Sequence, residues 1–266
     1  MAYTCFTGKS VWITGASSGL GCALALELAA QGARLILSGR NQDALNTVAA
    51  AAGSEARVLA FDLEDSAARE AASKQALSAF GSLDFLILNA GISQRSLFMD
   101  TSQKVFLKIM ETNFISSVDI TRAVLPAMVQ RGTGSILCIS SLAGLMGVPL
   151  RSSYSASKHA LAGFYASLRA EIEGSGVKIH IAYPGFVKTM ISHNALQGDG
   201  SPHGVLDPLQ EKGKTPVSTA QKILKSVAAG KLDIRVAMDA KARLALFLSR
   251  RAPSLAAKAL FSQKGL

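Results

Sequence analysis

Short runs rich in apolar and β-branched residues alternate with longer stretches rich in alanine and leucine, and this alternation restricts the possible folds more than any other feature. Several of the short runs are apolar throughout, which is typical of parallel strands covered on both faces. Helices are predicted between them, with the clearest at 20–31, 43–52, 66–80 and 155–172. Strands are predicted at 11–14, 34–38, 58–62, 85–88, 135–140, 177–182 and 234–238. We therefore predict an α/β fold with a doubly wound, parallel, seven-stranded sheet and helices on both faces.

The composition excludes several classes of protein. Of the 266 residues, 49% are hydrophobic and 17% are charged, against a charged share of about 25% in typical proteins. A disordered or coiled-coil chain would carry more charge, and no linker rich in Pro, Gly or Ser divides the sequence. We expect a single domain over residues 1–266, with an irregular loop at 190–216 and a basic amphipathic tail at 240–266. A loop of that length in a compact domain is usually functional.

Cysteine usage and the N-terminal sequence bear on the cellular compartment. Cys5, Cys22 and Cys138 are too few and too scattered for a disulfide framework, and their spacing is not that of metal ligands. The first eight residues lack a charged region followed by an apolar stretch. No apolar run approaches the ~18 residues that a membrane-spanning helix needs. We expect reduced thiols, no bound metal and a cytoplasmic protein.

Glycine residues follow the first predicted strand directly, in the segment Thr14-Gly15-Ala16-Ser17-Ser18-Gly19-Leu20-Gly21. Glycine permits a tight turn, brings the backbone close to a pyrophosphate and lets a helix pack closely on a strand. The following helix would present free N–H groups and its positive dipole end to phosphates. The alternative is a glycine-rich turn that binds nothing, but the strand-turn-helix context favours a Rossmann-like dinucleotide site. The expected contacts are Gly15, Ser17, Ser18, Gly19, Leu20 and Gly21.

The end of the second predicted strand indicates which dinucleotide would bind. Folds that use NAD usually place an acidic residue there, whereas an arginine accommodates the 2′-phosphate of NADP. This chain has Arg40 at that point and no acid before Asp43. NADP(H) is therefore favoured over NAD(H), although Arg40 could instead cap the strand end on the solvent face. After the third strand, Asp62 and Leu63 are placed to meet the adenine, while the alternative role of Asp62 is to cap the next helix.

Three polar residues suggest a reaction centre. Tyr154 has Lys158 four residues later on a predicted helix, so both side chains would lie on one face. An ammonium group beside a phenol favours the phenolate, which makes the phenol usable as a general acid or base. Ser141 follows an apolar strand, where its hydroxyl could hold a substrate carbonyl. The alternatives are an ordinary surface pair on an amphipathic helix and a serine that satisfies a turn.

These residues together resemble the short-chain dehydrogenase/reductase family, and the resemblance runs from Lys9 to about Thr189. Within the family, the stretch from Asn89 to His159 is most similar to the dehydrogenase/reductase member-seven group. Each motif is weak alone, whereas their order and spacing together are specific. The motifs are Thr14-Gly15-x-x-x-Gly19-x-Gly21, Asp62-Leu63, Asn89-Ala90-Gly91, Asn113, Ser141, Tyr154-x-x-x-Lys158 and Pro184-Gly185-x-x-x-Thr189.

The resemblance implies a hydride-transfer site. Tyr154 would exchange a proton with the substrate oxygen, and Lys158 would stabilise its phenolate and hold the nicotinamide ribose. Ser141 would orient the carbonyl, and Asn113 would link Lys158 through a water molecule to a proton path. The family's remaining cofactor contacts would map to Asn89, Ala90, Gly91, Pro184, Gly185, Val187 and Thr189. The cofactor supplies the hydride, while the protein supplies position and electrostatics.

Two residues depart from the family pattern. Leu88 replaces the usual first asparagine of Asn-Asn-Ala-Gly, a change we expect to affect sheet packing rather than chemistry. Ser18 stands where many NADP enzymes carry Arg or Lys, so the NADP assignment rests mainly on Arg40 and the missing acid.

The expected function is an NADP(H)-dependent carbonyl reductase or alcohol dehydrogenase. The apolar segment 145–150 suggests a lipophilic ketone, aldehyde or secondary alcohol as substrate, although these residues could simply pack in the core. The competing interpretation is a non-catalytic NADP(H)-sensing or scaffold protein on the same fold. A sensor has no need of Ser141, Tyr154 and Lys158 together.

The formal net charge is +10, and the tail beyond Ala240 contains no acidic residue. Its apolar residues Leu244, Phe247 and Leu248 are expected on one helical face, with a break at Pro253. One hypothesis is peripheral contact with a membrane surface, and the favoured alternative is packing on the domain or a neighbouring subunit. Nucleic-acid binding is not expected, because interleaved aromatics and a reader motif are missing. The family resemblance implies a homodimer or homotetramer.

Overall fold

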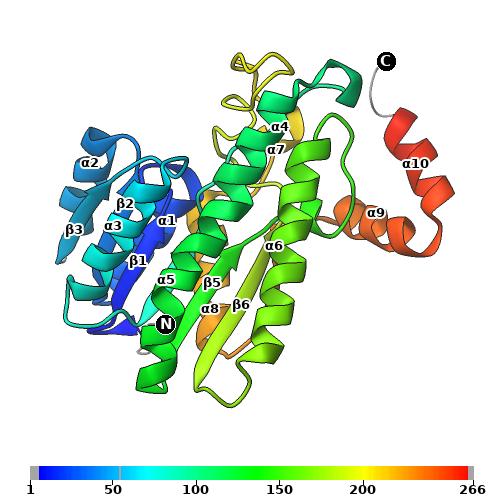
Figure 1. Cartoon of the computed structure of the whole chain (residues 1–266). Coiled ribbons are helices and arrows are strands. Elements are labelled where there is room, and N and C mark those ends of the chain that lie inside the picture. The colour runs from blue at the N-terminus through cyan, green and yellow to red at the C-terminus, as the bar shows by residue number, and fades with distance from the viewer. Residues whose placement is uncertain (1–5, 54, 263–266) are drawn as a thin grey trace.

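A computed structural model of the chain describes residues 6–53 and 55–262. Seven parallel strands form one sheet in the order β3-β2-β1-β4-β5-β6-β7 (Figure 1). Their bounds are β1 Ser10–Thr14, β2 Arg34–Gly39, β3 Ala56–Ala60, β4 Phe85–Leu88, β5 Gly134–Ile139, β6 Val177–Pro184 and β7 Asp233–Val236. The order reverses between β1 and β4, as in a doubly wound sheet. The predicted fold class is therefore confirmed.

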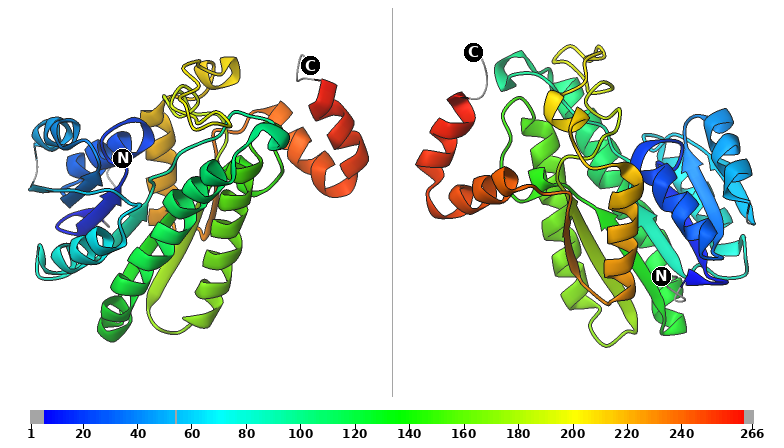
Figure 2. Two further views of the ribbon diagram at one scale, coloured as in Figure 1. Left: turned by 45° about the horizontal axis from the view of Figure 1, so that its top comes forward. Right: turned by 180° about the vertical axis from the view of Figure 1, so that it is seen from behind.

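Helices cover both faces of the sheet (Figures 1 and 2). One face carries α1 Gly19–Ala30, α2 Gln42–Ala52 and α8 Pro216–Ala228. The other carries α3 Ser66–Ser78, α5 Ser116–Arg131 and α6 Ser152–Glu171. Shorter or peripheral helices are α4 Gln103–Met110, α7 Pro208–Glu211, α9 Ala240–Arg251 and α10 Pro253–Ser262.

Two hydrophobic layers hold this sandwich together. In β1, Val11 and Ile13 pack into the layer beneath α1 and α8, whereas Trp12 points into the layer beneath α3 and α5. All three side chains are fully buried, as the apolar pattern of a central parallel strand predicts. The Trp12 indole Nε1 donates to Ser38 Oγ on β2 at 2.9 Å, so the one polar atom of this ring is satisfied.

The structure corrects several predicted strand bounds: the strand expected at 234–238 ends at Val236, the one expected at 177–182 extends to Pro184, and the third strand shifts as a whole. The third strand was expected at 58–62 but occupies Ala56–Ala60, because its register is set by pairing with β2 from Leu35 to Gly39. Phe61 and Asp62 therefore follow the carboxyl end of β3 and lie outside the strand.

Segment 190–216 is largely irregular, as expected, but isolated bridges attach it to the body. Leu196 pairs with Gln94, and Lys214 pairs with Val187. One short helix, α7, lies within it.

The C-terminal helices lie to one side of the sheet (Figures 1 and 2). The break at Pro253 separates α9 from α10, as predicted. The apolar face of α9 is not the expected one: Ala242 and Leu246 pack against Leu142 and Met146, while Leu244 and Phe247 are 58% and 60% exposed. None of the described helices combines the length and the apolar character needed to cross a bilayer.

Candidate active site

The glycine loop lies at the carboxyl end of β1 and is clamped by the end of β4. Gly15 has φ +66°, and a Cβ atom there would stand 2.7 Å from the Ala90 Cα. Asn89 Nδ2 donates to the Thr14 and Gly15 carbonyls at 3.1 and 3.0 Å. Helix α1 begins at Gly19, and its N-cap Ser18 makes no side-chain capping bond. Free backbone N–H groups at a helix start suit an anion.

Gly21 has a packing role that sequence reasoning did not separate from cofactor contact. A Cβ atom at Gly21 would stand 2.0 Å from the Gly15 carbonyl oxygen. Gly21 does not line the cavity described below. Glycine at this position lets α1 approach the loop, and its assignment as a cofactor contact stays a prediction.

A cavity of about 990 Å³ runs along the carboxyl edge of the sheet from the glycine loop to Tyr154. Its lining includes most of the residues predicted from the sequence. They are Gly15, Ser17, Ser18, Gly19, Leu20, Arg40, Asp62, Leu63, Asn89, Ala90, Gly91, Ser141, Tyr154, Lys158, Pro184, Gly185, Val187 and Thr189.

Tyr154 and Lys158 lie one helical turn apart near the start of α6, and both are buried. The Lys158 Nζ lies 5.8 Å from the centre of the Tyr154 ring and donates to the Ile139 carbonyl at 2.9 Å. A Cβ atom on Gly91 would lie 3.4 Å from that Nζ and 3.2 Å from Asn113 Oδ1, so a larger residue would crowd the ammonium and the amide. The ammonium is therefore held between β5 and the turn after β4, beside the phenol.

Asn113 does not line the cavity but lies directly behind it. It belongs to a π-helical turn, Glu111–Ile115, between α4 and α5. Asn113 Oδ1 accepts from the Ile92 N–H at 2.8 Å, and its Nδ2 donates to the Ile92 carbonyl and to Ser157 Oγ, both at 2.9 Å. It thus fixes the chain beyond Gly91 and the α6 turn between Tyr154 and Lys158. Such π-turns are frequent at functional sites.

The two serines after β5 have different environments. Ser140 Oγ donates to the Lys158 carbonyl at 2.9 Å, which ties β5 to α6. Ser141 lines the cavity, and its Oγ accepts from the Ala143 N–H at 3.1 Å. No described residue accepts the Ser141 hydroxyl hydrogen, so Ser141 caps its turn and can still donate into the cavity.

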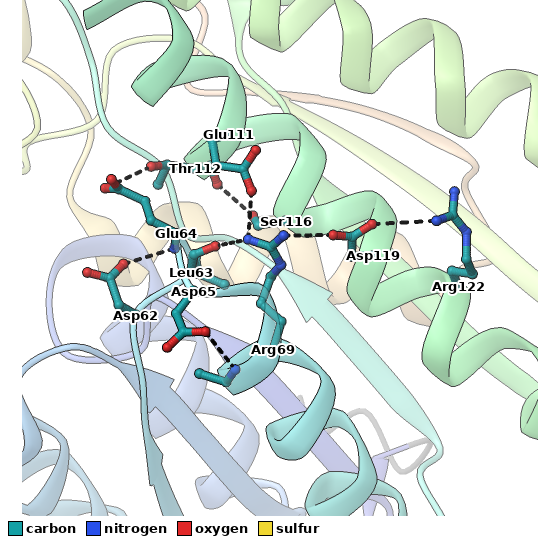
Figure 3. A network of polar contacts seen from close by, with 11 residues as sticks. Asp62, Leu63, Glu64, Asp65, Arg69, Glu111, Thr112, Ser116, Asp119 and Arg122 are labelled. Atoms are coloured by element: carbon teal, nitrogen blue, oxygen red, sulfur yellow. Dashed lines mark hydrogen bonds and ion pairs between the residues drawn. The ribbon is translucent and has the colours of Figure 1, made fainter. Parts of the chain in front are cut away.

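A polar network around Arg69, next to Asp62 and Leu63, was not predicted from the sequence (Figure 3). The buried Arg69 donates to the Leu63 carbonyl and pairs with Glu111 at 2.7 Å and Asp119 at 2.8 Å. It thereby connects the segment after β3 to the π-turn that carries Asn113. Helix α3 is capped by Asp65 rather than by Asp62, because Asp65 Oδ1 accepts from the Ala68 N–H.

Arg151 is a cavity residue that sequence patterns did not identify, because nothing distinguishes it from a surface arginine. It directly precedes α6 and lines the cavity near Tyr154. Its Nη2 donates to Asp207 Oδ2 at 2.9 Å, and Arg95 Nη2 reaches the same oxygen at 3.1 Å. Burial lowers the pKa of Arg151, and the neighbouring charge of Arg95 lowers it further. Two guanidinium groups therefore share one carboxylate of segment 190–216.

The segment after β6 lines the side of the cavity that faces α7. Thr189 Oγ1 accepts from Gln210 Nε2 at 3.2 Å, which joins α7 to this wall. Gln210 Oε1 is buried without a described partner, and Gln210 lines the cavity.

Comparisons with known proteins agree with this geometry. Residues 9–200 match the family model described as short chain dehydrogenase. The chain is 42% identical over 254 residues to dehydrogenase/reductase SDR family member 7B of Bos taurus, covering 92% of this chain and 78% of the relative. It is 39% identical over 255 residues to a Drosophila melanogaster protein named dehydrogenase/reductase SDR family protein 7-like, covering 93% and 78%. The chain belongs to the short-chain dehydrogenase/reductase family.

Solved structures show the same fold. A short-chain dehydrogenase/reductase from Burkholderia phymatum in complex with NAD superposes with a TM-score of 0.83 at 25% identity, covering 94% of this chain and 95% of the other. A short-chain dehydrogenase from Streptomyces avermitilis gives a TM-score of 0.80 at 28% identity, covering 97% of each chain. The family and these neighbours indicate an oxidoreductase with a nicotinamide cofactor.

Proposed function

We propose that the protein is an NADP(H)-dependent carbonyl reductase or alcohol dehydrogenase that acts through Ser141, Tyr154 and Lys158. The observation that carries this proposal is that these three side chains line the same cavity as the glycine loop. Family membership supports the reaction class. The cofactor preference, the substrate class and the residue roles go beyond family membership and are proposed here.

The chain offers a suitable place for a nicotinamide dinucleotide. Gly15 and Gly19 both have positive φ and line the cavity at the start of α1, where a side chain on Gly15 would strike the Ala90 backbone just after β4. The pyrophosphate would lie against these backbone N–H groups. Asp62 and Leu63 would border the adenine, and Pro184, Val187 and Thr189 the nicotinamide. When bound, the nicotinamide supplies or accepts the hydride.

The protein's own residues would handle the proton. The Tyr154 hydroxyl gives its proton to the substrate oxygen during reduction and takes it back during oxidation. The Lys158 ammonium, 5.8 Å from the centre of the Tyr154 ring, would hold the nicotinamide ribose, and its bond to the Ile139 carbonyl keeps it in place. The Ser141 hydroxyl donates to the carbonyl oxygen and so stabilises the negative charge that develops there.

Activity measurements test this mechanism. NADPH oxidation is followed against a panel of ketones, retinal and quinones, and we expect turnover with lipophilic members because Leu142, Val148 and Met190 line the cavity. Tyr154→Phe keeps the ring and removes the proton, so activity should fall by about 10²- to 10⁴-fold. Activity within a few-fold of wild type would refute the role of Tyr154. Tight NADPH binding without turnover on any substrate would favour the sensor function instead.

Arg40 carries the proposed preference for NADP(H). It is exposed at the cavity mouth beside Ser17 and Gly39, where a guanidinium can bind a 2′-phosphate. Arg40→Ala should weaken NADPH binding about tenfold or more and leave NADH binding unchanged. Arg122→Ala, which removes an exposed cation outside the cavity, is the matched control. Equal loss for both dinucleotides in the Arg40 variant would refute the preference.

We further propose a homodimer or homotetramer, as the family resemblance implies. Phe106 and Leu107 on α4 and Val129 on α5 are exposed, and burial of such side chains favours association. Light scattering coupled to size-exclusion chromatography tests this, and a monomer at micromolar concentration would refute it.

A further inference from the structure

A second groove, of about 720 Å³, lies between α9, α8 and β7, and it is strongly cationic. Its lining contains six basic residues and no acidic one. From the body of the protein come Lys214, Lys222 and Arg235, and from α9 come Arg243, Arg250 and Arg251. The tail's positive charge therefore faces further positive charge across a hollow instead of an acidic patch.

These six cations are unpaired. None lies within 4.0 Å of a carboxylate in the described part of the chain, whereas Arg69, Arg95, Arg151 and Arg169 all form ion pairs. Like charges gathered around a concave surface repel one another and raise the local concentration of anions. The groove is therefore complementary to a ligand that carries several negative charges.

Apolar side chains accompany the charge. Phe247 lines the groove and is 60% exposed, and Leu244 on α9 and Leu255 on α10 are 58% and 59% exposed. Helix α9 is anchored through Ala242 and Leu246, so its exposed residues are presented from a fixed support. Exposed large apolar residues beside a cluster of cations are characteristic of interfacial membrane-binding helices.

We propose that this groove and the exposed faces of α9 and α10 dock on an anionic membrane, with lipid phosphate groups bound by the six cations. A bilayer provides both the phosphate layer for the cations and an apolar layer for Phe247, Leu244 and Leu255. A soluble phosphate would satisfy only the cations. Both helices lie beside the sheet rather than on its faces, which leaves them accessible (Figure 2).

The experiment compares two variants of the full chain with equal net charge. Lys222→Gln/Arg235→Gln/Arg250→Gln removes one groove cation each from α8, β7 and α9. Lys225→Gln/Lys231→Gln/Lys241→Gln removes three exposed cations on or next to the same elements that do not line the groove. Co-sedimentation is measured with phosphatidylcholine vesicles with and without phosphatidylserine. Thermal stability and NADPH binding are measured in parallel to show that both variants fold.

We expect wild type and the second variant to bind vesicles containing phosphatidylserine and not pure phosphatidylcholine. The groove variant should bind on the order of 100-fold more weakly, because each of the three lost cations weakens binding about fivefold. Phe247→Ser should also weaken binding, since it removes apolar contact without changing charge. Equal losses in the two triple variants would overturn the proposal, because net charge alone would then explain binding. Binding of inorganic phosphate or duplex DNA at the groove without vesicle binding would overturn it too.

Discussion

Arg151 and Asp207 form an ion pair of 2.9 Å between residues far apart in sequence, and it joins the start of α6 to segment 190–216. Arg95 shares the same carboxylate oxygen. The side chains of Asp207 and Arg151 are 9% and 14% exposed, and that of Arg95 is 25% exposed. The pair therefore fixes the position of a loop that has little regular structure of its own.

Asp207→Asn should release this loop. The asparagine can still cap α7, where Asp207 accepts from the Leu209 N–H, but it leaves two neighbouring guanidinium groups without a counter-charge. We expect a loss of about 2 kcal/mol in the free energy of unfolding, below the ~3–5 kcal/mol of a fully buried pair because Arg95 is partly exposed. Hydrogen exchange of residues 192–207 should also accelerate.

Asp199→Asn serves as the control for this experiment. Asp199 lies in the same loop, and its carboxylate accepts from the Ser201 N–H and hydroxyl and makes no ion pair within the described residues. Its replacement should leave both measurements nearly unchanged. If the two variants behave alike, the ion pair does not hold the loop.

Gly15 should tolerate alanine far less well than Gly53, although both have positive φ near +60°. A Cβ atom at Gly53 meets nothing within 4 Å, so Gly53→Ala should cost only about 1 kcal/mol of backbone strain. At Gly15 the added atom also meets the Ala90 backbone at 2.7 Å, which adds about 1–3 kcal/mol of overpacking. Urea unfolding measures both costs. Equal costs would show that the loop moves freely away from β4.

Asn113 should matter for stability as well as for catalysis. Asn113→Ala removes three hydrogen bonds and strands the Ile92 N–H, so we expect a loss of about 2–3 kcal/mol. Ser157→Ala removes only the bond to Asn113 and that to the Tyr154 carbonyl, with a loss of about 1 kcal/mol. Denaturant unfolding distinguishes the two. A smaller loss in Asn113→Ala than in Ser157→Ala would contradict this account.

His180 should make stability depend on pH. Burial in β6 lowers its pKa, and its Nδ1 lies 2.7 Å from the Lys231 carbonyl. Because the folded-state pKa lies below the unfolded value of about 6.5, the unfolded chain binds the proton more readily. The contribution of the neutral His180 side chain to the free energy of unfolding is therefore fully present above about pH 6.5 and is lost as pH falls below that value. His180→Phe should flatten the decline in unfolding free energy between about pH 7 and 5.5. An unchanged slope would show that His180 does not titrate on unfolding.

The sequence predicted the sheet and most of the cavity lining because these depend on local signals. Apolar runs, glycines after a strand and the Tyr154–Lys158 spacing each act over a few residues. The features it missed depend on contacts between distant segments. The position of β3 is set by pairing with β2. Gly21 packs closely against Gly15. Arg151 stands out from other arginines only through its bond to Asp207, 56 residues away. Likewise, the apolar periodicity predicted a helix at α9, but it did not predict which apolar side chains of that helix would pack against the domain.

The packing of α9 on Leu142 and Met146 has a consequence for how the C-terminus can be altered. Leu142 directly follows Ser141 and Met146 lies one short turn further along the chain. With α9 packed on them, both side chains are largely shielded from solvent. A chain shortened before Ala240 would expose Leu142 and Met146 to water and loosen the cavity wall beside Ser141. We therefore expect such a truncation to impair turnover, even if the tail's only biological task is to hold the protein at a lipid surface.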